Sequence, residues 1–305
     1  MATGRTDVPP PQDERLRRAE RAENFPVALR VLPARQRERL HAVYAVLRVI
    51  DDLGDEPVPV AGSGTGHRPG TTPAQRLRRL EEFRADLDGV WSGAPVRAPV
   101  LAALAPVVRD TGLAREPFEN LLEANIADQR VSRYRTWDEL LGYCALSAQP
   151  VGRIVLTLFG VPAGPGLLRD CDAVCTALQL LEHWADVGED LRRGRVYLPA
   201  DDLRAFGVTE SDLAAVRAGP ALRRLVRHET ARARAMLDGG AVAVASLRGW
   251  ARLAVAGYVA GGCAAADALD RADGDVLSGD GAAARRRRTD VARHLPGALL
   301  ARSPR

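Results

Sequence analysis

Lysine is absent from this 305-residue sequence, in which all 43 basic residues are arginines and 39 residues are Asp or Glu. Its absence excludes Schiff-base chemistry, a P-loop lysine and a catalytic lysine base. Arginine, by contrast, is well suited to bidentate contacts with phosphate oxygens. The formal net charge of +4 is small and evenly spread, so the composition argues against nucleic acid as a partner.

Cysteine and histidine are also scarce, with four and five residues respectively. The cysteines lie in apolar helical segments and form no CxxC pair, which predicts reduced thiols. The histidines show no ligand spacing such as HExxH, which argues against a zinc site. The polar, arginine-rich residues 1–21 do not resemble a signal peptide. We therefore expect a cytoplasmic protein.

Long apolar runs are missing too. The most apolar segment, 253–266, is too short and too rich in Ala and Gly to span a bilayer. The only basic run, Arg285 to Arg288, lies in a segment rich in Gly, Asp and Ala. It predicts a solvated segment or weak peripheral contact with the inner face of the membrane.

Aromatic residues make up only 5% of the sequence, and no sustained alternating run of β-branched residues occurs. Helix formers dominate, so we expect an all-α protein. We predict a disordered N-terminus at 1–12, one all-helical domain at 13–270 and a Gly/Arg-rich tail at 271–305. The apolar periodicity predicts helices at about 13–32, 35–52, 74–91, 99–111, 116–131, 136–159, 167–192 and 220–237, and a last helix, after Gly239 and Gly240, that ends near 269.

The predicted helix at 167–192 carries three acidic residues, Glu182, Asp186 and Asp190, at successive steps of four. This spacing stacks their carboxylates on one face, about 6 Å apart per step. Like charges at this spacing repel each other, and either arginines or metal ions could offset the repulsion. The alternative is a solvated acidic face, with the arginines of 192–195 as surface partners.

A second acidic cluster, 51–56, favours a functional interpretation. Asp51 and Asp55 repeat the spacing of four at the end of another apolar helix, and Tyr44 and Arg48 fall on the same side of that helix. Residues 57–73 then form a loop rich in Gly, Pro and Thr. Such a loop could close over a site as a flap or could be a plain insertion.

Two carboxylate pairs supply hard oxygen ligands without His or Cys, and this ligand set favours Mg²⁺ over zinc or copper. Mg²⁺ commonly binds through a few carboxylates together with substrate phosphates. Arg48 and Arg195 lie near the two pairs in sequence and could hold the remaining phosphate oxygens. The pattern therefore predicts departure of a diphosphate, with an apolar cavity to shelter the carbocation that remains.

These residues belong to three longer patterns, Tyr44-x3-Arg48-x2-Asp51-Asp52-x2-Asp55, Tyr143-Cys144-x2-Ser147-Ala148 and Gln179-x6-Asp186-x3-Asp190-x4-Arg195-x-Tyr197-x-Pro199. In this order they resemble the successive signatures of the squalene and phytoene synthase family, over roughly 24–199. The segments 23–28, 51–56 and 147–152 look most similar to the bacterial hopanoid-pathway branch that makes hydroxysqualene.

The resemblance implies an isoprenoid-synthase (terpenoid synthase) helical bundle around a central cavity, dependence on Mg²⁺ and a prenyl diphosphate substrate. For this branch it implies that presqualene diphosphate loses diphosphate, rearranges and is quenched by water to hydroxysqualene, with hand-off to other squalene-pathway enzymes. The implied metal ligands and catalytic residues are Asp51, Asp55, Asp186 and Asp190, with Asp52, Glu56 and Glu189 as weaker candidates. The implied substrate contacts are Tyr44, Arg48, Asp52, Asp128, Tyr143, Gln179, Glu182, Arg195 and Tyr197.

Two positions depart from the family pattern, because Glu182 stands where Asn is usual and Ala185 stands where Arg is common. Glu182 could be an extra metal ligand or could support the ligands from behind. Asp128 and Tyr143 could equally be a buried structural Asp and a packing Tyr. Two other functions stay open. One is head-to-head condensation to presqualene diphosphate, squalene or phytoene, and the other is a non-catalytic helical partner that retains the fold.

Overall fold

The computed structural model describes residues 32–55, 72–279, 281, 284 and 288–300. Every regular element in these ranges is helical, as the composition predicts, and one isolated bridge joins Arg133 and Val196. The predicted disordered N-terminus, nearly all of the first predicted helix and most of the loop at 57–73 lie outside the described residues. The helices are α2 (Ala34–Gly54), α3 (Pro73–Ser92), α4 (Pro99–Thr111), α5 (Glu116–Ala127), α6 (Trp137–Ser147), α7 (Gln149–Leu158), α8 (Pro165–Ala185), α9 (Val187–Arg192), α10 (Ala200–Phe206), α11 (Glu210–Leu213), α12 (Pro220–Gly240), α13 (Ala243–Ser246), α14 (Gly249–Arg271) and α15 (Arg288–Leu299).

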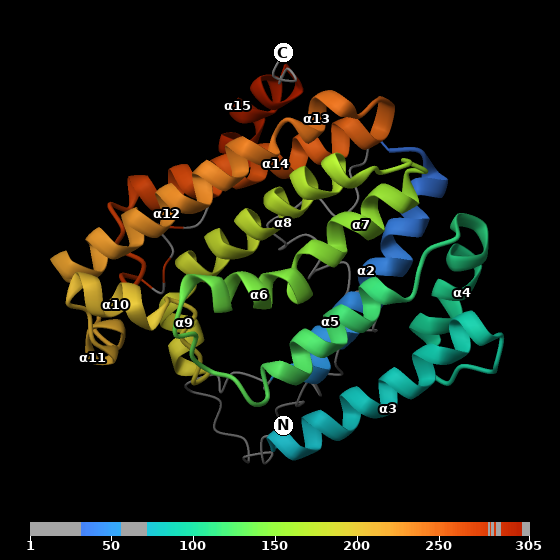
Figure 1. Ribbon diagram of the computed structural model, residues 1–305, viewed down its shortest axis with the longest axis horizontal. Coiled ribbons are helices and arrows are strands. Elements are labelled where there is room, and N and C mark those ends of the chain that lie inside the picture. Colours follow the sequence, from blue (N-terminus) through green and yellow to red (C-terminus); the bar gives the residue numbers. More distant parts are fainter. Residues whose placement is uncertain (1–31, 56–71, 280, 282–283, 285–287, 301–305) are drawn as a thin grey trace, which may run out of the picture.

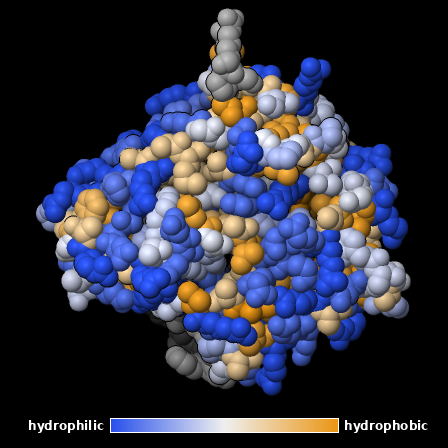
Figure 2. Space-filling view, viewed as in Figure 1, coloured by the Kyte–Doolittle hydropathy of each residue, from blue (hydrophilic) through white to orange (hydrophobic). Residues whose placement is uncertain are grey.

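Three long helices, α8, α12 and α14, run side by side across the molecule, and each contacts the other two (Figure 1). A second group of contacting helices consists of α2, α3, α4 and α5. α7 packs against α8, α5 and α2, so it joins the two groups into one bundle. On the face shown in Figure 2, hydrophilic residues dominate and apolar residues gather in small patches.

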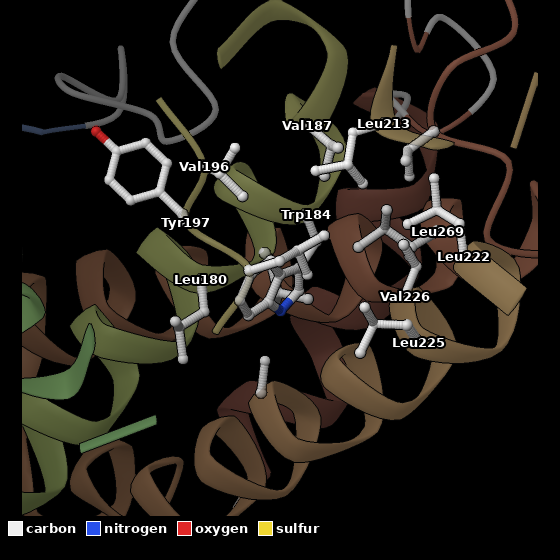
Figure 3. Packing of buried hydrophobic residues seen from close by; sticks show 14 of the residues in the cluster. Leu180, Trp184, Val187, Val196, Tyr197, Leu213, Leu222, Leu225, Val226 and Leu269 are labelled. Carbon is white, nitrogen blue, oxygen red and sulfur yellow. The ribbon is translucent and has the colours of Figure 1, made fainter. Parts of the chain in front are cut away.

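The core around Trp184 ties the segment after α9 to the bundle. Trp184 is fully buried on α8, and α12 contributes Leu222, Leu225 and Val226 to the same core (Figure 3). Val196 and Tyr197 belong to the same core, although they lie outside any helix. The hydroxyl group of Tyr197 points away from Trp184 (Figure 3). Hydrophobic packing therefore fixes the position of this segment while its polar groups face elsewhere.

α14 is longer than the apolar segment at 253–266 that the sequence suggested. Within the described part of the chain it is the one helix whose length and composition could cross a membrane. However, 67% of the most apolar 18-residue stretch of this helix is buried inside the protein, among residues of α8, α12 and α15. This burial is typical of a core helix.

Two predicted helices are each divided in the structure. The helix predicted at 167–192 divides at Asp186, whose backbone (φ −106°, ψ 16°) leaves helical geometry between α8 and α9. The helix predicted at 136–159 divides at Ala148, two residues before Pro150. Pro150 has no N–H to donate, so it is tolerated in the first turn of a new helix, where that N–H would have no partner.

The segment predicted as a C-terminal tail, 271–305, contributes to the fold, so the boundary predicted at 270 is wrong. Val276 and Leu277 are buried in the core that contains Trp184. Asp275 accepts hydrogen bonds from the N–H of Ala218 and from the guanidinium of Arg223. α15 then packs along α14. The few buried apolar residues lie in a segment whose composition is rich in Gly and Arg, so the sequence pattern did not predict their contacts.

Gly239 and Gly240, predicted to separate two helices, form the end of α12. A Cβ atom at Gly240 would lie 2.5 Å from the carbonyl oxygen of Asp170 and 3.0 Å from the backbone nitrogen of Val174 on α8. A Cβ atom at Gly239 would meet nothing within 4 Å. Gly240 therefore allows α12 to approach the backbone of α8.

We expect Gly240→Ala to lower the free energy of unfolding by about 1–3 kcal/mol, because the backbones of α8 and α12 must move apart. The matched control, Gly239→Ala, should be neutral or stabilising by up to about 1 kcal/mol, because Ala favours a helix over Gly. Urea denaturation of both variants measures the difference. Equal effects of the two substitutions would contradict the close approach.

Candidate active site

The end of α2 presents the first acidic cluster. Asp51 is exposed, and Asn125 Nδ2 on α5 donates to its Oδ1 at 3.4 Å. Arg48 forms an ion pair of 2.8 Å with Asp52, one turn further along the helix. Asp55 follows the last helical residue, and its N–H still donates to the carbonyl of Asp51 at 2.9 Å. The predicted pair of aspartates is thus kept one turn apart.

Gly54 sets the distance between this cluster and α5. A Cβ atom at Gly54 would lie 2.2 Å from Oδ1 of Asn125, so a larger residue would displace that side chain. Gln129 Nε2 donates to the carbonyl of Gly54 at 2.9 Å. Of the remaining predicted residues here, Tyr44 is half-buried earlier on α2, and Glu56 lies outside the described residues.

The second acidic cluster surrounds the break between α8 and α9. Asp186 is half-buried at the break, and Glu182 is half-buried one turn before it. Asp190 is buried in α9, where its Oδ2 lies 3.7 Å from Nδ1 of His183. The N–H of Asp186 donates to the carbonyl of Glu182 at 3.0 Å, and that of Asp190 to Asp186 at 2.8 Å. The three carboxylates therefore keep their spacing of one turn despite the break.

The segment after α9 is held by the segment that precedes α6. The N–H of Val196 donates to the carbonyl of Ser132 at 2.9 Å. Arg133 Nη1 donates to the carbonyl of Gly194 at 2.6 Å. Arg195 thus lies between two residues with anchored backbones, which limits the positions available to its side chain.

Two arginines of this segment join the acidic clusters. Arg195 Nη1 donates to Oδ1 of Asp55 at 3.1 Å, and the N–H of Arg195 donates to the carbonyl of Asp190 at 2.8 Å. Arg193 pairs with Glu189 at 2.8 Å, and its Nη1 lies 3.8 Å from Oδ2 of Asp55. The two acidic segments, about 140 residues apart in sequence, therefore meet in space. The guanidinium groups offset part of the repulsion between the carboxylates.

Asp128 follows α5, and its side chain, which is only 8% exposed, lies beside this junction. The hydroxyl of Tyr143 donates to its Oδ2 at 2.9 Å, and Arg195 Nη1 lies 4.0 Å from the same oxygen. Oδ1 of Asp128 has no hydrogen-bond partner among the described residues. Burial raises the pKa of Asp128 to about 6, against the opposing effects of the Arg195 charge and the Tyr143 hydrogen bond. Burial acts to lower the pKa of Arg195, but its electrostatic interactions with Asp128, Tyr197 and Asp55 outweigh burial and raise that pKa.

Four rings pack together beside these charges. Tyr197 stacks on His183, with ring centroids 3.6 Å apart and an interplanar angle of 15°. Its ring centroid also lies 5.8 Å from that of Tyr134 and 5.6 Å from that of Tyr143. Burial raises the pKa of all three tyrosines, so they keep their phenolic protons at neutral pH. Gln179, a predicted substrate contact, has its Nε2 3.1 Å from Nε2 of His183.

The sequence patterns do not mark His183, Asn125 or Tyr134 as site residues, and they indicate only a surface role for Arg193. His183 lies four residues after Gln179, which places both on one face of α8, and this spacing was the only signal available. Asn125, Tyr134 and Arg193 reach the site through contacts between distant segments, which no local spacing reveals.

The donor set fits a hard divalent cation. The predicted ligands Asp51, Asp55, Asp186 and Asp190 offer carboxylate oxygens, and no cysteine lies among the site contacts described above. Asp51 is exposed and Asp186 is half-buried, so these carboxylates are accessible to an ion that keeps part of its hydration. Arg193 and Arg195 already contact Asp55, so its negative charge would interact with these two arginines and with such an ion.

A different acidic group lies between α10 and α12. Ligand atoms of Asp202, His228 and Glu229 lie within 4.8 Å of one another. Arg232 already pairs with Asp202 at 3.0 Å and with Glu229 at 3.3 Å, and its guanidinium stacks on the ring of Trp137 at 3.6 Å. A guanidinium therefore already pairs with both carboxylates of this group.

The bundle brings the two acidic segments together through Arg195 and Asp55, and its all-α architecture matches the isoprenoid-synthase fold of solved squalene synthase structures. The solved structure of squalene synthase HpnC from Alicyclobacillus acidocaldarius matches the protein with a TM-score of 0.70 and 36% identity, over 85% of this chain and 93% of that chain. The sequence model of the squalene/phytoene synthase family matches residues 18–293, and the chain belongs to that family. The resemblance seen in the sequence is therefore confirmed.

Individual relatives have different activities. A hydroxysqualene synthase of Sinorhizobium fredii is 31% identical over 229 residues, which are 75% of this chain and 72% of that protein. A presqualene diphosphate synthase of Rhodopseudomonas palustris is 34% identical over 203 residues, 65% of this chain and 66% of that protein. The protein is thus an enzyme of a family of head-to-head prenyl condensation, for which a prenyl diphosphate substrate is implied.

The buried Asp128 leads to a prediction about pH. Its folded-state pKa of about 6 lies above the ordinary value of 3.8, so between these pH values the folded state binds more protons than the unfolded state. The stabilisation is full below about pH 4 and is lost as pH rises through about 6. Asp128→Asn cannot ionise, so it should reduce the fall in the free energy of unfolding between these limits by about 1–3 kcal/mol.

Urea denaturation near pH 4 and near pH 7 measures this fall in both proteins. Tyr143→Phe serves as the matched comparison, because it removes a hydrogen bond that lowers the pKa of Asp128 and should move the fall to higher pH. Parallel pH profiles in wild type and Asp128→Asn would show that this carboxyl is not the source.

Proposed function

We propose that the protein converts presqualene diphosphate into hydroxysqualene, with release of diphosphate and capture of the carbocation by water. The observation that carries this proposal is the junction at Arg195, which contacts Asp55 from one acidic segment and the backbone of Asp190 from the other. The branch-like segments in the sequence and the similarity to hydroxysqualene synthases support the choice of product.

The carboxylates of the two acidic segments would hold Mg²⁺, which when bound neutralises charge on the departing diphosphate. The arginines around them supply planar donors for phosphate oxygens. Arg195 is suited to this role because its backbone is anchored and neighbouring carboxylates keep it charged. The residues proposed as metal ligands are Asp51, Asp55, Asp186 and Asp190, and those proposed to contact the diphosphate are Arg48, Arg193 and Arg195.

The buried rings are proposed to form the wall of the carbocation site. Ring faces attract cations, and the protonated phenols of Tyr134, Tyr143 and Tyr197 are poor nucleophiles that do not trap the intermediate. The hydroxyl of Tyr143 is oriented by its hydrogen bond to Asp128. Glu182, half-buried one turn before Asp186, is a polar group that could hold the attacking water while bulk water is excluded.

A second candidate is condensation of two prenyl diphosphates. The 34% identity to a presqualene diphosphate synthase supports it, and every proposed metal ligand would serve that reaction equally. The two candidates differ in substrate and product, so product analysis distinguishes them.

We expect Asp186→Asn to reduce diphosphate release from presqualene diphosphate by about a thousandfold or more, because it removes the charge of a carboxylate that would hold the metal ion. Asn and Asp have similar volumes, so circular dichroism and the thermal unfolding temperature should stay near those of wild type. Asp238→Asn, an exposed acid on α12, is the control and should retain full activity. Near-normal activity of Asp186→Asn would mean that the acids form a solvated face.

In heavy-oxygen water, the hydroxysqualene product should carry the label, because the hydroxyl oxygen comes from solvent. Mass spectrometry of the product formed from presqualene diphosphate measures this, and added NADPH should change nothing. Squalene formed only with NADPH, or presqualene diphosphate accumulating from farnesyl diphosphate, would instead assign the condensing activity.

A further inference from the structure

His183 lies in the middle of the candidate site, yet it falls in an unspecified position of the pattern that runs from Gln179 to Asp186. Its side chain is only 9% exposed. It contacts three elements at once, because Gln179 lies on α8, Asp190 on α9 and Tyr197 in the segment after α9. Residues of all three elements have roles in the proposed reaction, whereas His183 has none.

One hydrogen bond of the imidazole indicates which nitrogen carries its proton. Nε2 of Gln179 can only donate, so Nε2 of His183 accepts this hydrogen bond, 3.1 Å long. The ring proton therefore lies on Nδ1, which faces Oδ2 of Asp190 at 3.7 Å. Although this distance is longer than a hydrogen bond, the positive N–H end of the ring dipole points at the carboxylate.

The ring also fixes the position of Tyr197. The ring centroids lie 3.6 Å apart with an interplanar angle of 15°, so each ring restricts the orientation of the other. Tyr197 lies two residues after Arg195, in the segment anchored to Ser132 and Tyr134. One imidazole thus links the carboxylate of Asp190 to the segment that carries the bridging arginine.

We propose that His183 is a positioning residue for the cation site, through the N–H of Nδ1 that orients Asp190 and through its stack on Tyr197. This inference rests on the proposed function, because it assumes that Asp190 binds a divalent cation. Removal of a group that orients a metal-ligating carboxylate commonly lowers metal affinity by about 10–100-fold. A purely structural role would require only a flat ring at this position.

The experiment compares two substitutions. His183→Phe keeps a ring that can stack on Tyr197 but removes both nitrogens. His183→Asn places an amide nitrogen near the position of Nδ1 and removes most of the stack. Mn²⁺ is titrated into each protein in the presence of inorganic pyrophosphate, and the affinity is measured by calorimetry or by electron paramagnetic resonance.

We expect His183→Phe to weaken Mn²⁺ binding by about 10–100-fold and His183→Asn to recover most of that loss. Affinity of His183→Phe equal to that of wild type would overturn the inference and leave the proposed function intact. Failure of wild type to bind Mn²⁺ with pyrophosphate would overturn the proposed function itself. Thermal unfolding of each variant shows whether it is folded.

A measurement on wild type keeps the test decisive if His183→Phe does not fold. In protein labelled with ¹⁵N-histidine, long-range proton–nitrogen correlation spectra distinguish the two ring tautomers, and the signal of His183 is the one that disappears in His183→Asn. We expect a protonated Nδ1 and an unprotonated Nε2. A proton on Nε2 alone would turn the acceptor nitrogen toward Asp190 and overturn the proposal.

Discussion

The ion pair between Arg195 and Asp55 is the contact on which the proposed site depends. It joins the end of α2 to the segment after α9, and the same arginine is fixed to α9 through the carbonyl of Asp190. Its guanidinium also lies 4.0 Å from Asp128, so without it the carboxylates of Asp55 and Asp128 would lose the charge that offsets their repulsion. The hydrophobic core around Trp184 and the backbone contacts to 132–135 hold the arginine there.

The fold could be predicted from the sequence where apolar periodicity is strong. Helices α2 to α4 lie within two residues of their predicted bounds, because each has a clear buried face. The breaks at Ala148 and Asp186 were not predicted, since the periodic pattern continues across both positions. The C-terminal contribution was also missed, because a few buried residues such as Val276 lie within a segment of polar composition.

For the candidate site too, some features could be predicted from the sequence and others could not. Carboxylate pairs with a spacing of four are visible in the sequence, and the structure brings the segments that carry them together through Arg193 and Arg195. The positions of His183 and Tyr134 follow from the packing of distant segments, which spacing does not encode. Burial of Asp128 likewise depends on the tertiary structure, so its raised pKa could not be read from residue type.

We propose that the two acidic segments form one cation and diphosphate site. A crystal structure of the protein with Mn²⁺ and a non-hydrolysable thiodiphosphate analogue of presqualene diphosphate tests it most directly. Anomalous density for Mn²⁺ should lie between Asp51 and Asp55 on one side and Asp186 and Asp190 on the other, with the diphosphate against Arg195. Anomalous density confined to the group of Asp202, His228 and Glu229, or its absence from the acidic segments, would contradict the claim.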